Sequence, residues 1–113
     1  MANGTNEGML LVELAQWHSM AGIEEANAAI FDPEFDPDTA DARDEAVRKT
    51  LMWGETLGTL TKNRLISEEL ILDWIWVAGL WERVAEAALA SREEHGQPRL
   101  FENFEALAKS QSG

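Results

Sequence analysis

Two carboxylates stand out as candidates for chemistry, because Glu55 and Asp73 each lie within an otherwise apolar stretch of the sequence. A carboxylate removed from water needs a partner, and two such groups in one cleft can act as general acid and general base. The sequence gives no sign of that cleft. We therefore favour a structural role, in which each carboxylate pairs with Arg64, Arg83, Arg92 or a tryptophan N–H, over a carboxylate-dependent enzyme.

The histidines and acidic residues do not form a metal-site pattern. Neither His18 nor His95 has a carboxylate or a second histidine three or four residues away, so the helical pairs that hold zinc or di-iron centres are missing. The acidic run from Asp32 fails as a calcium loop, because its sixth position is Pro37 and its twelfth is Arg43, where glycine and glutamate are required. We expect no metal and no cofactor.

The composition indicates one globular domain in a reducing compartment. The chain has 113 residues, 45% of them hydrophobic and 27% charged, which suffices for a single hydrophobic core. It has no cysteine, and its N-terminus lacks the basic and apolar segments of a signal peptide, so we expect a cytoplasmic protein. The formal net charge of -12 repels phosphate groups, which disfavours nucleic acid and membrane surfaces as partners.

The elements that would position these residues are helices throughout. Apolar residues recur at helical spacing from residue 8 to 31, with an interruption at 19–22, where a serine and a glycine weaken the helix. Two prolines and several acids make residues 31–38 an acidic loop, which should precede a helix at about 39–63. Residues 1–7 and 110–113 are expected to be flexible tails.

A hydrophobic helix over residues 67–95 is expected at the centre of the fold. Ser67 is a good N-cap, and Gly96 followed by Pro98 is a good stop signal. A short amphipathic helix follows at about 98–109, and the sequence has no alternating strand pattern. The prediction is one all-α domain over residues 1–113, folded as a four- or five-helix up-and-down bundle.

Tryptophan and glycine supply the candidate interface or pocket. Five tryptophans are many for this length, and Trp74 and Trp76 must face nearly opposite ways on a helix, so one of them should lie outside the core. Two glycines one turn apart leave a strip where another helix, from this chain or a second one, can approach closely. The candidate residues are Trp53, Gly54, Gly58, Trp74, Trp76 and Trp81.

Residues 50–108 resemble a bacterial family of uncharacterised all-helical proteins, known only as a domain of unknown function. The residues that carry the likeness are Glu55-Thr-Leu-Gly58-Thr-Leu60, Leu65-Ile66-Ser-Glu-Glu-Leu70, Trp81, Arg92, Gly96-x-Pro98 and Phe104-Glu105-x-Leu107-Ala108. The resemblance implies a helical fold and a buried polar cluster of Glu55, Trp81, Arg92 and Glu105, to which we add Asp73 from its apolar surroundings. Arg64 stands where the family has a glycine, so we expect Asn63 to make the left-handed turn.

Abundant tryptophan and the lack of catalytic patterns favour a noncatalytic helical protein-interaction module, with a second copy of the chain or another protein as partner. The alternative is a small-molecule sensor or carrier, in which Trp53, Trp74 or Trp81 lines a pocket and Glu55 or Asp73 orients the ligand. Mimicry of nucleic acid by the acids of residues 32–45 is a further alternative, and a carboxylate-dependent enzyme is the least favoured.

Overall fold

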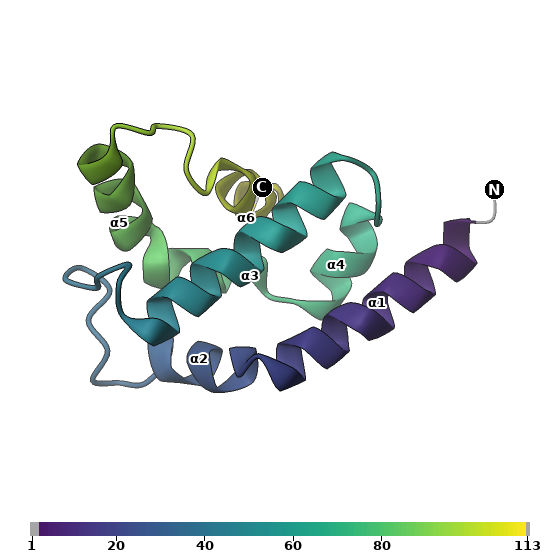
Figure 1. Cartoon of the computed structure of the whole chain (residues 1–113), viewed down its shortest axis with the longest axis horizontal. Helices are drawn as coiled ribbons and strands as arrows, with labels where there is room; N and C mark the ends of the chain where they lie inside the picture. The colour runs from purple at the N-terminus through teal and green to yellow at the C-terminus, as the bar shows by residue number, and fades with distance from the viewer. Residues whose placement is uncertain (1–2, 113) are drawn as a thin grey trace.

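The computed structural model describes residues 3–112 and folds them into six helices (Figure 1). These are α1 (Asn3–Met20), α2 (Ile23–Ile30), α3 (Glu45–Lys62), α4 (Glu68–Trp74), α5 (Val77–His95) and α6 (Glu102–Ser112). The predicted all-α fold is confirmed, and the described residues contain no strand. Apart from the long segment between α2 and α3, the connections are only two to six residues long.

The central helix of the domain is α3, around which α2, α4, α5 and α6 pack. Its inward side buries Val47, Leu51 and Leu57 at the helical spacing visible in the sequence. We expected one helix over residues 67–95 at the centre of the fold, but the structure divides these residues into α4 and α5, and both pack on α3. The N-terminal part of the first helix, α1, projects beyond the other helices (Figure 1).

A break at Ile75 and Trp76 separates α4 from α5. Ile75 has extended backbone angles (φ -119°, ψ 134°), and Trp76 leaves the helical range with ψ at 77°. Gln111, near the end of α6, binds the backbone groups that the break exposes. Its side-chain oxygen accepts from the N–H of Ala78 (2.8 Å), and its side-chain nitrogen donates to the carbonyls of Leu72 (3.2 Å) and Ile75 (3.1 Å). A long-range contact thus replaces the hydrogen bonds of a continuous helix.

Most of the two segments that we expected to be tails belongs to helices. The Glu7 carboxylate on α1 accepts a hydrogen bond from the backbone N–H of Ser67 (2.7 Å), which ties α1 to the start of α4. At the other end, Ser110 lies in α6 and its hydroxyl donates to the Glu68 carboxylate. Residues 1, 2 and 113 of the expected tails lie outside the described part of the chain.

Left-handed residues end three of the helices. Gly22 (φ 73°) makes the predicted break between α1 and α2, and Gly96 (φ 62°) caps α5 as the sequence predicts. The turn after α3 corrects our expectation, because Arg64 itself takes the left-handed conformation (φ 60°), whereas Asn63 has φ -90°. The N–H of Leu65 bonds to the carbonyl five residues earlier (2.9 Å), and this cap geometry decides which residue turns left-handed.

Candidate interaction surface

An exposed pair of stacked rings lies where the end of α2 meets the start of α5. The ring centroids of Phe31 and Trp76 are 6.0 Å apart, and their planes differ by only 10°. The side chain of Trp76 is 64% exposed and that of Phe31 42%. Gly79 leaves room for the indole, since a Cβ at this position would lie 2.4 Å from the Trp76 ring. We call Phe31 and Trp76 the aromatic pair; it presents an ordered apolar surface to solvent.

Arg83 on α5 contacts Phe31, one member of the aromatic pair. Its guanidinium donates to the backbone carbonyls of Ile30 (2.7 Å) and Phe35 (3.3 Å). The same group lies 5.8 Å from the ring centroid of Phe31 and 5.3 Å from that of Phe35, within the range of a cation–π contact. Arg83 therefore binds carbonyls and aromatic rings, in place of the buried carboxylate that the sequence suggested, and it fixes the end of α2 to α5.

The loop between α2 and α3, residues 31–44, starts at the aromatic pair and is folded by its own aspartates. Asp32, Asp36 and Asp41 each accept a hydrogen bond from the backbone N–H two residues later, at 2.8, 3.0 and 2.8 Å. Side-chain bonds from Arg43, together with its backbone N–H, lower the pKa of Asp41 to about 2. Such local bonding competes with helix formation, so α3 begins at Glu45 and not near residue 39.

Trp53 lies inside the core and takes no part in the surface. It is fully buried, and its ring centroid is 5.3 Å from that of Trp17, 5.0 Å from that of His18 and 5.9 Å from that of Trp74. Its indole N–H is buried without a hydrogen-bond partner among the described residues. The neighbouring aromatic faces are weak acceptors for such a group. As a candidate interface or pocket residue, Trp53 is therefore corrected to a core residue.

Trp76 is the most exposed of the candidate tryptophans. Trp74 is 37% exposed and packs its ring against Trp53 in a T-shaped contact. Trp81 is partly buried and lies 5.1 Å from the ring centroid of Phe104. The break between α4 and α5 turns Trp76 outward, whereas we had reasoned from the opposite faces of one continuous helix.

Gly54 and Gly58 are used within the domain. A Cβ on Gly54 would lie 2.3 Å from the Phe104 ring, and a Cβ on Gly58 would lie 2.3 Å from the backbone oxygen of Asn103. Both glycines are buried on α3, and α6 crosses them at a distance that only glycine permits. Of the two alternatives for this strip, a helix of this chain or of a second one, the structure shows the first, because α6 occupies it.

Glu55 supplies the cap for α6 from the neighbouring helix α3. One carboxylate oxygen accepts from the backbone N–H groups of Asn103 (3.1 Å) and Phe104 (3.0 Å), and the other accepts from the Asn103 side chain (2.9 Å). The first N–H groups of a helix have no partner within it, and the helix dipole favours a negative charge at this end. Glu55 thus serves the stability of the fold.

Arg92 and Glu105 complete the polar cluster at the start of α6. Arg92 donates to the carbonyl of Leu100 (2.7 Å) and forms an ion pair with Glu105 (2.8 Å), and its guanidinium lies 6.0 Å from the Trp81 ring centroid. Lys109 also binds the Glu105 carboxylate (3.0 Å). Hydrogen bonds from Lys109, and then from Arg92, lower the pKa of Glu105. These contacts tie α5 to α6.

Asp73 does not belong to that cluster. It is exposed on α4 and lies beside Glu7, Ser67 and Leu70 in a shallow hollow of the surface. Its apolar sequence neighbours misled the expectation of burial, since α4 is short and packs only one side on the core. Glu55 contacts α6 instead, so the structure does not bring Glu55 and Asp73 together as an acid–base pair.

The described residues contain no group of three histidine, aspartate or glutamate side chains arranged to hold a metal ion. Within the same part of the chain, no helix is both long and apolar enough to cross a membrane.

A profile of the family described as "Domain of unknown function (DUF4760)" matches residues 11–111. The chain belongs to this family. The match extends beyond the resemblance seen over residues 50–108 and includes α2 and the loop after it, so the aromatic pair lies within the family's domain. No curated protein and no solved structure matches the chain.

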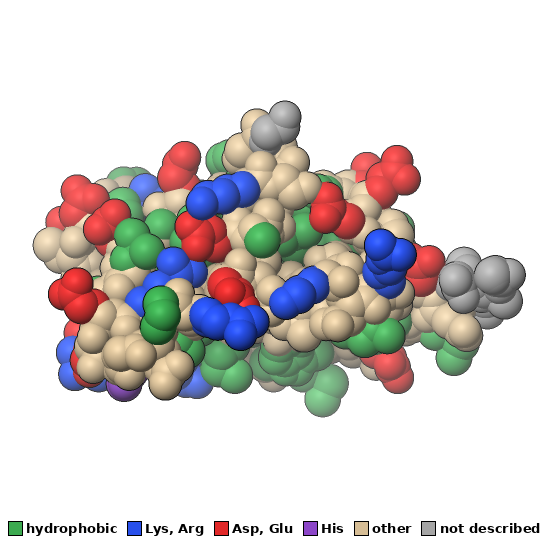
Figure 2. Space-filling view, turned by 90° about the horizontal axis from the view of Figure 1, so that it is seen from above, with side chains coloured by type: hydrophobic (Ala, Val, Ile, Leu, Met, Phe, Trp, Pro, Cys, Tyr) green, Lys and Arg blue, Asp and Glu red, His purple; other side chains and the backbone are tan. Residues whose placement is uncertain are grey.

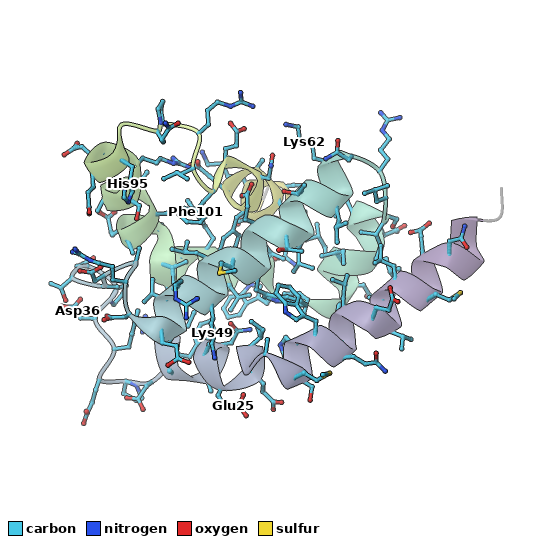
Figure 3. All side chains as sticks on the ribbon, viewed as in Figure 1. Glu25, Asp36, Lys49, Lys62, His95 and Phe101 are labelled. Atoms are coloured by element: carbon cyan, nitrogen blue, oxygen red, sulfur yellow. The ribbon has the colours of Figure 1, made fainter. Side chains whose placement is uncertain are left out.

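The sequence did not single out several residues that shape this surface. Phe31 and Phe35 occur in Phe-Asp-Pro-Glu-Phe-Asp-Pro, and two aromatic residues in an otherwise polar proline-containing loop are a signal that could have found them. Nothing in the sequence marked Gln111 as the residue that binds the break between α4 and α5. Nor did anything mark Phe101, which has a left-handed backbone (φ 59°) just before α6. Phe101 and His95 line a groove of about 780 Å³. Figure 3 labels both side chains, with His95 near the end of α5.

Proposed function

We propose that this protein is a noncatalytic interaction domain that binds a partner protein through the aromatic pair. The observation that carries the proposal is the exposed stack of Trp76 on Phe31, supported by Gly79 and Arg83. Tryptophan is enriched among the residues that dominate interface energies, and an ordered ring loses little conformational entropy on binding. We further propose the cytoplasm as the compartment, because the chain has no cysteine.

The exposure of Trp76 depends on a costly feature of the backbone. A continuous helix over residues 68–95 would satisfy its own hydrogen bonds, whereas the break at Ile75 and Trp76 relies on three hydrogen bonds with the Gln111 side chain, which donates two and accepts one. Departures from local rules tend to coincide with functional sites. The break therefore favours a role for the outward orientation of Trp76 over incidental exposure.

The small-molecule alternative has less support. Trp53, one of the tryptophans expected to line the pocket, is enclosed by other rings. Of the two groups expected to orient a ligand, Glu55 caps a helix and Asp73 is exposed at the surface. The groove of about 780 Å³ contains no tryptophan and neither of the two candidate carboxylates, although alanines and Phe101 share its lining with polar and charged residues such as Asp41, Glu94 and His95. We therefore keep the sensor or carrier as the second hypothesis.

Selection of peptides from a random display library against the immobilised protein tests the proposal. Binding of the enriched peptides should be lost in Trp76→Ser and retained in Leu89→Ser, which removes another exposed apolar side chain (44%) from α5. Far-ultraviolet circular dichroism should show that both variants are folded. Peptides that bind both variants equally, or no enrichment at all, would contradict the proposal.

Sedimentation equilibrium decides whether the partner is a second copy of the chain. If the aromatic pair mediates self-association, the protein should be a dimer that Trp76→Ser dissociates and Leu89→Ser leaves intact. If the protein is a monomer, the partner that we propose is a different protein.

A further inference from the structure

Arginine on an aromatic ring is a contact that this fold uses repeatedly. The guanidinium of Arg83 lies over Phe31 and Phe35, and that of Arg92 lies over Trp81, at centroid distances between 5.3 and 6.0 Å. Trp76 stacks on Phe31, a ring that Arg83 also contacts, and no cation of the described residues lies within cation–π distance of the Trp76 ring. The indole remains 64% exposed beside Phe31 and Gly79, so solvent-accessible ring surface is available to a further cation.

Acidic residues lie close in sequence to both members of the aromatic pair. Asp32 directly follows Phe31, and Asp73 precedes Trp76 by three residues. Residues 32–44 carry six acids and one base, Arg43, which is already paired with Asp41 at 2.9 Å. Figure 2 shows carboxylates standing out from the end of the molecule where this loop lies. The resulting field attracts cations and repels anions such as nucleic acid or acidic lipid.

We infer that the aromatic pair binds an arginine-bearing segment of a partner protein, with the guanidinium stacked on Trp76 and its N–H groups directed to the acids of the loop that begins at Phe31. This inference rests on the interaction domain proposed above and names the chemistry of its partner. Arginine fits better than lysine, because a planar guanidinium stacks on a ring and donates hydrogen bonds at its edge at the same time. A second copy of the chain is less suited, since two molecules of formal charge -12 repel each other.

Fluorine NMR of the protein labelled with 5-fluorotryptophan provides the test. The Trp76 signal is assigned as the one missing in Trp76→Phe, and it is followed during titration with four short peptides. These alternate alanine with arginine, lysine, glutamine or glutamate. The arginine peptide should shift the Trp76 signal, the lysine peptide should bind roughly tenfold more weakly, and the other two should leave the signal unchanged.

Matched variants test the contribution of charge. Asp32→Asn should weaken binding of the arginine peptide several-fold and reduce its salt dependence, whereas Glu13→Gln, an exposed acid on α1, should have little effect. Binding without a shift at Trp76, or equal binding by the glutamine peptide, would overturn the arginine inference. Equal binding by the glutamine peptide would leave the proposal of an interaction domain intact. That proposal would fail only if no peptide, designed or selected, needed Trp76 for binding.

Discussion

Removal of the Glu55 carboxylate should destabilise the protein far more than a typical change on a partly exposed helix surface. In Glu55→Ala, the backbone N–H groups of Asn103 and Phe104 and the Asn103 side chain lose their acceptor. Loss of a helix cap costs about 0.5–2 kcal/mol, and a buried donor left without a partner costs about 1–3 kcal/mol. Because water can reach part of this site, we expect a loss of about 2–3 kcal/mol in the free energy of unfolding.

Urea denaturation followed by circular dichroism measures this loss. The midpoint should fall, and the melting temperature should drop by roughly 10–20 °C, given the size of the domain. Glu55→Gln keeps one acceptor oxygen and should lie between wild type and Glu55→Ala. The matched control is Glu45→Ala on the same helix, where an exposed ion pair with Lys49 (2.8 Å) is screened by solvent and its loss should change stability little.

Hydrogen exchange locates the effect. The amides of α6 should lose protection in Glu55→Ala at denaturant concentrations where those of α3 remain protected. If Glu55→Ala and Glu45→Ala reduce the free energy of unfolding equally, the Glu55 hydrogen bonds add nothing measurable, and the other contacts of α6 hold it on the domain. The role given to Glu55 would then be wrong.

Three further predictions concern the contacts of α6 and α5. Gly58→Ala should cost about 2 kcal/mol in urea denaturation, because the added Cβ would meet a backbone oxygen at 2.3 Å, whereas Gly8→Ala, with nothing within 4 Å, should be neutral or stabilising. Gln111→Ala should cost about 1–3 kcal/mol and speed hydrogen exchange at the start of α5; unchanged exchange would show that the break does not depend on this side chain. The lowered pKa of Glu105 means that its ionised form favours the folded state, so this stabilisation is complete above the ordinary pKa of 4.5 and is lost as the pH falls through the lowered value. Thermal melts across the acid range should show a shallower decline in Glu105→Gln than in wild type, and parallel curves would refute the assignment.

The sequence was sufficient to predict most of the helices, because their ends carry local signals. Ser67 caps α4 by accepting from the N–H of Leu70 (3.0 Å), and Gly22 and Gly96 provide the left-handed turns that end α1 and α5. The break at residues 75–76 has no glycine or proline, and the group that stabilises it, Gln111, lies 36 residues from Ile75. Periodicity reports only local preference, so it indicated a single long helix.

The positions of some polar residues could be predicted from the sequence, and the position of another could not. The family resemblance pointed to Glu55, Arg92 and Glu105, and the structure places all three at the start of α6, although no spacing in the sequence shows that a later helix would arrive beside Glu55. Asp73 was expected there because its sequence neighbours are apolar, but neighbours in sequence do not determine which side of a short helix faces solvent. Trp76 was a candidate from the start, whereas its partner Phe31 became evident only from the tertiary contact.

The cap that α3 provides for α6 also has a consequence for folding kinetics. Glu55 and Phe104 are 49 residues apart in the chain, so their hydrogen bond closes a large loop and raises the contact order of a helical domain whose other contacts are mostly local. Interactions of this kind form late, after the helices on either side of the loop have collapsed. Weakening them should therefore accelerate unfolding and leave the refolding rate nearly unchanged. We therefore expect these three hydrogen bonds at one end of α6 to affect the lifetime of the native state more than the time needed to reach it.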